Sequence, residues 1–106
     1  MKIAVIGAGN GGQSISGYLA MQGYEVSLYD IDEKRISELN EKGGITLEGK
    51  LSGFGKISSI TTDIEKAVAG AEIVMVTTVA NAHRAVAKSI APYVTDGMVI
   101  ILNPGR

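Results

Sequence analysis

The 106-residue chain predicts an α/β fold, in which a doubly wound parallel sheet carries helices on both faces. Two observations support this class. Short uninterrupted apolar runs, such as residues 73–76, alternate with segments whose apolar residues recur every three or four positions. Strands that are buried on both faces read as continuous apolar runs, and helical connections make neighbouring strands parallel. We therefore expect five strands in the order 3-2-1-4-5 with right-handed crossovers.

The first half of the chain predicts two strands, each followed by a helix. An apolar run at residues 3–6 leads through a glycine-rich segment into helical periodicity at residues 13–22. A second strand follows near residues 26–30. Apolar residues from Ile31 onward then repeat at helical spacing up to Gly43, and acidic residues in the first turn suit the helix dipole.

The segment at residues 45–59 breaks this pattern, because glycines are interspersed among its apolar residues. Two short strands around a glycine-rich turn, an inserted β-hairpin, fit it best. Residues 44–50 also spell G-x-x-x-x-G-K, the start of a mononucleotide phosphate loop, but Leu51 stands where that motif needs Ser or Thr for Mg²⁺. No buried strand precedes the segment, so we interpret it as a hairpin turn.

The second half predicts three more strands and two helices. The strands are expected at residues 57–61, 73–76 and 98–102. The first helix is capped by Thr62 or Asp63, and the second covers residues 81–91, where Pro92 ends it. A complete fold of this kind continues to a sixth strand, so we expect residues 1–106 to be one domain of a longer chain. The uncovered edge of the last strand would then favour self-association.

Between the first strand and the first helix lies the motif G-x-G-x-x-G, formed by Gly7, Gly9 and Gly12. The first glycine permits a tight turn, the second lets the backbone approach a pyrophosphate, and the third lets the helix pack closely on the strand. The N–H groups and the dipole at the start of the helix favour an anion. The order of strand, glycine motif and helix predicts a dinucleotide site in a Rossmann-type fold.

Asp30 ends the second strand, at roughly the twenty-residue spacing at which such folds place a carboxylate against the adenosine ribose. Its charge would repel the 2′-phosphate of NADP(H), so we expect NAD(H) as the cofactor. Arg35 is a solvated helix charge in the simplest interpretation, although it can reach an adenosine phosphate. The loops after the fourth and fifth strands lie on the same rim of the sheet. The predicted cofactor-binding residues are Gly7, Gly9, Asn10, Gly11, Gly12, Asp30, Thr78, Val79, Ala80 and Asn103.

Composition argues against several other classes. Ten basic and eleven acidic residues give a net charge of −1 without a polycationic run, against binding to nucleic acid or an anionic membrane. The chain has no cysteine for a disulfide, thiolate metal site or nucleophile, and one histidine, His83, is too few for a multi-histidine centre. Helix-start histidines are commonly solvated, so we assign no catalytic residue and no metal ligand. No apolar run approaches the roughly 18 residues of a membrane span, and no leader precedes the first strand, which favours a cytoplasmic location.

Three segments of the chain resemble one known family. Residues 2–13, 29–32 and 100–105 are similar to the N-terminal domain of opine dehydrogenases, the group that includes octopine, nopaline and N-(carboxyethyl)norvaline dehydrogenases. The resemblance covers the whole chain, and its specific features are the Gly-Asn-Gly-Gly loop and the Asn-Pro-Gly ending. Glycerol-3-phosphate dehydrogenases and ketopantoate reductases are similar in this domain and form the alternative.

The resemblance implies NAD(P)-dependent reductive condensation of an amino acid with a 2-oxo acid, with hydride passing between C4 of the nicotinamide and the imine carbon. It assigns the pyrophosphate to residues 9–12, the adenosine ribose to Asp30, and the far half of the cofactor to residues 78–80 and Asn103. Val79 departs from the family, which often has proline there. The family's catalytic histidine belongs to a second domain. We therefore expect this chain to bind NAD(H) without turnover, either as part of such an enzyme or as a stand-alone NAD-binding module.

Overall fold

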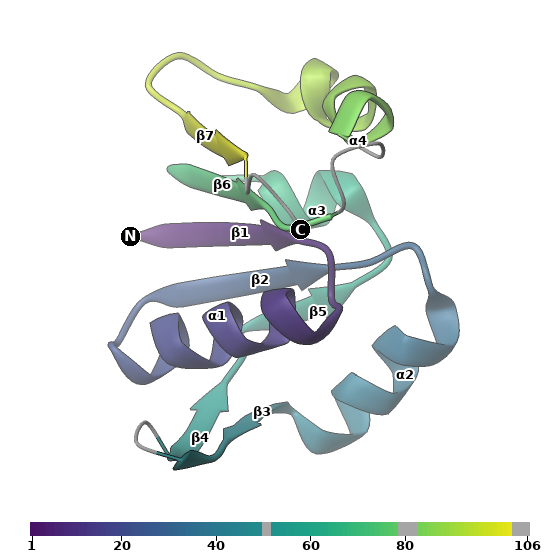
Figure 1. Ribbon diagram of the computed structural model, residues 1–106. Helices are drawn as coiled ribbons and strands as arrows, with labels where there is room; N and C mark the ends of the chain where they lie inside the picture. Colours follow the sequence, from purple (N-terminus) through teal and green to yellow (C-terminus); the bar gives the residue numbers. More distant parts are fainter. Residues whose placement is uncertain (50–51, 79–82, 103–106) are drawn as a thin grey trace.

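The computed structural model describes residues 1–49, 52–78 and 83–102, and it contains the doubly wound sheet that the sequence predicts (Figure 1). Five strands are hydrogen-bonded in the order β5-β2-β1-β6-β7, and each neighbouring pair is parallel. Counted within this sheet alone, the order is 3-2-1-4-5, so the predicted topology is confirmed. The strands are β1 (Lys2–Ile6), β2 (Glu25–Tyr29), β5 (Ser59–Thr61), β6 (Ile73–Val76) and β7 (Val99–Leu102).

Helices cover both faces of this sheet. They are α1 (Asn10–Met21), α2 (Glu33–Lys42), α3 (Ile64–Val68) and α4 (His83–Ile90), and a 3-10 helix (Ala91–Tyr93) follows α4. On the face of α1 and α2, the core includes Val5 and Leu28. On the face of α3 and α4, it includes Ile6 and Val76. Adjacent residues of β1 therefore enter different cores, because successive side chains of a strand point to opposite faces.

The start of α2 differs from the prediction. Asp32 is the N-cap residue, because its carboxylate accepts a hydrogen bond from the N–H of Arg35 at 3.1 Å, and the helix begins at Glu33. Ile31 was expected to be the first apolar residue of this helix, but it lies outside it and is 81% exposed. An aspartate at the N-cap satisfies a first-turn N–H that an aliphatic side chain leaves without a partner, so the cap decides where the helix starts.

One other helix boundary departs from the prediction, and a second lies outside the described residues. Helix α1 begins at Asn10 rather than at residue 13, because the end of the glycine motif forms its first turn. The expected start of α4 at residue 81 lies outside the described residues, which resume at His83. Pro92 does follow the end of α4, but the chain continues in 3-10 geometry around it. None of the helices in the described ranges is long and apolar enough to cross a membrane.

The predicted hairpin is present and packs against α1. Strands β3 (Gly44–Leu47) and β4 (Gly53–Lys56) pair antiparallel, with Ile45 opposite Gly55. The hairpin lies at the α1 side of the molecule, away from β6 and β7 (Figure 1). A Cβ on Gly55 would collide with the backbone of Gly17 in α1, so two facing glycines bring strand and helix into backbone contact. An antiparallel pair in this place excludes the mononucleotide phosphate loop.

Strand β7 lies at one end of the strand order, with β6 as its hydrogen-bonded neighbour. Its four aliphatic side chains are between 40% and 53% exposed. Parallel strands of this composition are ordinarily covered on both faces. The end of the sheet at β7 is therefore the part of the fold with the most exposed apolar strand surface among the described residues.

Candidate functional site

The glycine motif forms a tight turn between β1 and α1. Gly7 follows β1 with a φ of 119°, in the region that favours glycine, and its N–H donates to the carbonyl of Tyr29 at 2.7 Å. A Cβ on Gly12 would collide with the carbonyl oxygen of Gly7. Internal packing alone therefore requires glycine at residues 7 and 12.

The other two glycines of the motif are not explained by packing. Gly9 is the N-cap residue of α1 with an ordinary φ of −76°, and Gly11 lies in the first turn without a positive φ. Apart from the chain neighbours and the backbone of the helix itself, no described atom lies within 4 Å of a Cβ built on either residue. The space beside both Cα atoms is open, at the end of the helix where first-turn N–H groups have no intrahelical partners. This end of α1 is suited to an anion that approaches the backbone closely.

Asp30 directly follows β2 and is hydrogen-bonded on both carboxylate oxygens. Oδ2 accepts from the N–H of Ala8 at 2.8 Å, and Oδ1 accepts from the N–H of Asp32 at 2.9 Å. Nη1 of Arg35 lies 3.5 Å from Oδ2, with the arginine side chain 44% exposed and the aspartate side chain 14% exposed. Asp30 therefore lies at the end of the second strand, as predicted, and it also lies beside the glycine turn with a cation at its open side.

Two further side chains support the same turn, a role that the sequence did not predict for either of them. Nε2 of Gln13 donates to the carbonyl of Ala8 at 2.8 Å from the second turn of α1. The hydroxyl of Thr77, directly after β6, lies 2.9 Å from the carbonyl oxygen of Gly7. The available signal for Thr77 was its position at the carboxyl end of the strand next to β1. Hydrogen bonds between side chain and backbone leave no periodic pattern in a sequence, so Gln13 carried no such signal.

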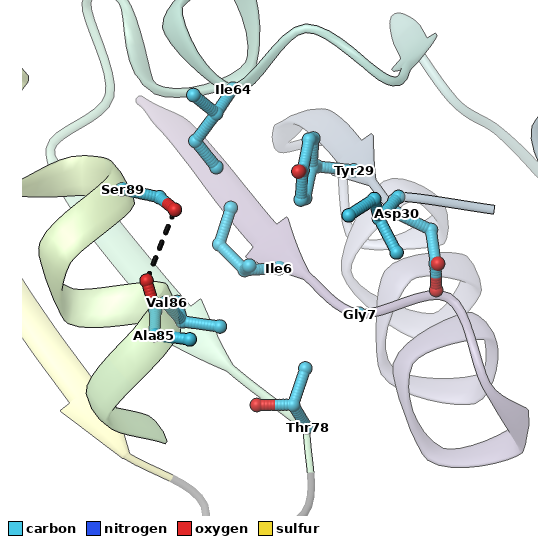
Figure 2. A pocket seen from close by; sticks show the side chains of 10 residues that line it. Ile6, Gly7, Tyr29, Asp30, Ile64, Thr78, Ala85, Val86 and Ser89 are labelled. Carbon is cyan, nitrogen blue, oxygen red and sulfur yellow. Dashed lines mark hydrogen bonds between the residues drawn. The ribbon is translucent and has the colours of Figure 1, made fainter. Parts of the chain in front are cut away.

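A pocket of about 220 Å³ adjoins the turn, between the ends of β1 and β2 and helix α4 (Figure 2). Its walls are largely aliphatic, with Ile64 and Val86 on one side and Asp30 at the other. Ser89 does not offer its proton to the pocket, since its hydroxyl donates to the carbonyl of Ala85 at 3.0 Å. The pocket is lined by Ile6, Gly7, Tyr29, Asp30, Ile31, Ile64, Thr78, Ala85, Val86 and Ser89. An apolar group attached to a polar one fits this distribution of walls.

Tyr29 brings a phenol to the wall of this pocket. Partial burial raises the pKa of its hydroxyl above the ordinary value of 10.0, and the negative charge of the neighbouring Asp30 raises it further. The phenol is therefore uncharged at neutral pH, and it adds no negative charge to the one that Asp30 already supplies.

The structure brings most of the predicted residues together, and a few fall outside the described ranges. The glycine motif, Asp30 and Thr78 lie at the carboxyl ends of β1, β2 and β6, and Asn10 begins α1. Val79, Ala80 and Asn103 lie outside the described residues. Within the described ranges, no group of three histidine, cysteine, aspartate or glutamate side chains is placed to hold a metal ion.

The chain is similar to several dehydrogenases in sequence and in fold. The family model described as the NAD-dependent glycerol-3-phosphate dehydrogenase N-terminus matches residues 2–103. An opine dehydrogenase of Arthrobacter sp. (strain 1C) is 42% identical over 103 residues, which are 96% of this chain and 29% of that protein. An octopine dehydrogenase in complex with NADH and agmatine aligns with a TM-score of 0.82 at 29% identity, over 98% of this chain and 28% of that one. A PanE/ApbA family ketopantoate reductase from Ralstonia eutropha JMP134 aligns with a TM-score of 0.80 at 26% identity, over 97% of this chain and 34% of that one.

These relatives confirm the resemblance to opine dehydrogenases, and both groups expected as alternatives are among the matches. The chain spans less than a third of the opine and octopine dehydrogenases that it matches. Because the family model covers residues 2–103, the chain belongs to the family of the NAD-dependent glycerol-3-phosphate dehydrogenase N-terminus.

Proposed function

We propose that this chain is the NAD(H)-binding domain of an opine-type oxidoreductase. The fold, the glycine turn and the pocket support binding of a dinucleotide, and the 42% identity to an opine dehydrogenase supports that group over the alternatives. When bound, the nicotinamide supplies a hydride donor or acceptor. The protein's own residues bind and orient the cofactor.

The single observation that carries this proposal is the open space at Gly9 and Gly11. Neither residue needs to be glycine for its φ or for contacts with described atoms, yet both lie at the anion-binding end of α1. A ligand whose phosphates approach the backbone accounts for both glycines. The adenosine ribose then lies at Asp30, and the adenine enters the aliphatic pocket between α4 and the end of β2. Residues Thr78, Val79, Ala80 and Asn103 contact the rest of the cofactor.

The reaction itself is part of the proposal. By analogy with its relatives, the longer protein would join an amino acid to a 2-oxo acid and reduce the imine, with octopine-type products as one example. The domain that supplies the acid for this step would correspond to the part of the relatives that this chain does not span. The alternative functions are the cofactor domain of a glycerol-3-phosphate dehydrogenase or ketopantoate reductase relative, and a stand-alone NAD-binding module.

Two finer statements complete the proposal. We propose a cytoplasmic location, since NAD(H) is available to dehydrogenases there; fractionation of the cells that make the protein tests it. We also propose self-association through β7, because its four aliphatic side chains are all exposed at the end of the sheet.

Titration of NADH into the wild type and two glycine variants tests the binding proposal. Gly9→Ala and Gly11→Ala add one methyl group where the described fold leaves space, so both variants should fold. We expect about tenfold weaker NADH binding or worse, because the methyl group would occupy the position of the phosphates. Ser14→Ala, on an exposed part of the same helix, is the matched control and should bind NADH as the wild type does. Wild-type affinity in both glycine variants would contradict the proposed phosphate site.

A further inference from the structure

Thr77 connects the ends of two neighbouring strands through its backbone and its side chain. Its N–H donates to the carbonyl of Ile6 at 2.9 Å, which continues the pairing of β1 with β6. Its Oγ1 lies 2.9 Å from the carbonyl oxygen of Gly7 and 3.2 Å from that of Ile6. A hydroxyl has one proton to donate, and the shorter distance assigns it to Gly7.

The carbonyl that Thr77 binds is the one against which α1 packs. A Cβ on Gly12 would collide with the carbonyl oxygen of Gly7, and it would lie 2.9 Å from Oγ1 of Thr77. A Cβ on Gly7 would lie 2.7 Å from the same Oγ1. The carbonyl of Gly7 therefore lies against both the hydroxyl of Thr77 and the backbone of Gly12, where β6, β1 and α1 come together.

We propose that Thr77 is a positioning residue for the phosphate-binding end of α1. By holding the Gly7 carbonyl, its hydroxyl fixes how closely the first turn of α1 approaches β1, and so where the N–H groups of that turn point. It acts through Gly7 and Gly12 rather than by touching the phosphates. This inference rests on the proposed function, because it concerns the same site.

Binding by three variants and three ligands tests the proposal. Thr77→Val removes the hydroxyl at nearly constant shape, Thr77→Ser keeps it, and Thr46→Val makes the first change at an exposed position of β3. NADH and ADP contain a pyrophosphate, whereas adenosine has no phosphate. We expect Thr77→Val to bind NADH and ADP about fivefold to tenfold more weakly and adenosine as the wild type does. Thr77→Ser should recover affinity to within about twofold of the wild type.

Three outcomes would overturn the proposal: wild-type affinity for ADP in Thr77→Val, equal weakening by Thr77→Ser, or an equal loss for adenosine. Amide shifts from nuclear magnetic resonance of the free protein give a second readout. The N–H signals of Gly11 and Gly12 should move in Thr77→Val and stay in place in Thr46→Val; unmoved signals would contradict the positioning role. If the wild type binds no NADH, the proposed function fails, and these shifts still decide whether Thr77 sets the turn. Should Thr77→Val not fold, Thr77→Ala provides the same comparison with less steric demand.

Discussion

The carboxylate of Asp30 accepts a hydrogen bond from the backbone N–H of Ala8 at 2.8 Å. The acidic residue at the end of β2 is therefore also a support of the turn that leaves β1. A carboxylate that accepts backbone N–H groups forms charge-assisted hydrogen bonds, which are stronger than neutral ones. Arg35, 3.5 Å from the same oxygen, adds a cation at the exposed side of this arrangement.

Substitution of Asp30 should separate its support of the turn from its proposed effect on the preference for NAD(H). Asp30→Asn removes the charge but keeps an oxygen that can accept from Ala8, whereas Asp30→Ala removes both. In each variant we expect the preference for NAD(H) over NADP(H) to fall by about tenfold, since the repulsion of the 2′-phosphate is lost. NADH itself should bind more weakly to Asp30→Ala than to Asp30→Asn, because only the former leaves the N–H of Ala8 without its partner.

The measurement is calorimetric titration of both nucleotides into both variants. Glu41→Gln, an equal loss of charge at an exposed position of α2, serves as the control and should leave the preference unchanged. Equal affinity of the wild type for NAD and NADP, or an unchanged preference in both Asp30 variants, would show that Asp30 does not face the ribose.

Gly12→Ala should destabilise the protein, in contrast to Gly11→Ala. The added Cβ at residue 12 meets the carbonyl oxygen of Gly7, which cannot move without displacing the turn. We expect the free energy of unfolding to fall by about 2–4 kcal/mol. At residue 11 the Cβ meets no described atom beyond its chain neighbours and the backbone of its own helix, and alanine is the better helix former by up to about 1 kcal/mol. Urea denaturation of both variants measures the difference, and equal stability would refute the packing argument.

Deprotonation of the Tyr29 phenol should lower the free energy of unfolding at alkaline pH. Its pKa is raised in the folded state above 10.0, so the unfolded chain loses this proton first as the pH rises. The contribution of this phenol to the free energy of unfolding is complete below its pKa in the unfolded chain. It is lost between that pKa and the higher pKa of the folded state. Between about pH 9 and about pH 11, the wild type should therefore lose more unfolding free energy than Tyr29→Phe does. Parallel losses in the two proteins would show that Tyr29 titrates as it does in the unfolded chain.

Purified residues 1–106 should bind NADH without oxidising it when an amino acid and a 2-oxo acid are added. Cofactor binding uses strand ends that this chain contains, whereas protonation of the imine needs an acid placed beside it. Absorbance of NADH at saturating substrate concentrations checks this expectation. Substrate-dependent oxidation above the blank would make His83, at the start of α4, the first residue to substitute.

The exposed strand β7 should drive association at high concentration. Apolar side chains on an unpaired edge favour contact with a second copy, and a lysine there opposes it. Sedimentation at high micromolar concentration should show dimers or larger species for the wild type and fewer of them for Ile101→Lys. Tyr24→Lys adds the same charge at a different exposed apolar residue and should not change the association. A wild-type monomer with a high Tm would count against the prediction.

The sequence predicted those parts of the fold that apolar runs, helical periodicity and glycine spacing encode. Continuous apolar runs identified β1 and β6, and the glycine spacing identified the turn before α1. The predicted start of α2 was wrong because Ile31 matched the apolar period of the helix, whereas the N-cap hydrogen bond of Asp32 decides the boundary. The supports of the turn from Gln13 and Thr77 were missed, since such contacts depend on distances across elements and not on residue spacing.

The backbone contact between Gly17 and Gly55 holds the hairpin against helix α1. Helix α1 has 12 residues and is about 18 Å long, stiff enough to act as a rod. The first turn of the helix lies next to the turn after β1, and its middle packs against β4. A side chain at residue 55 would therefore push β4 away from the middle of the helix whose first turn carries the proposed phosphate site.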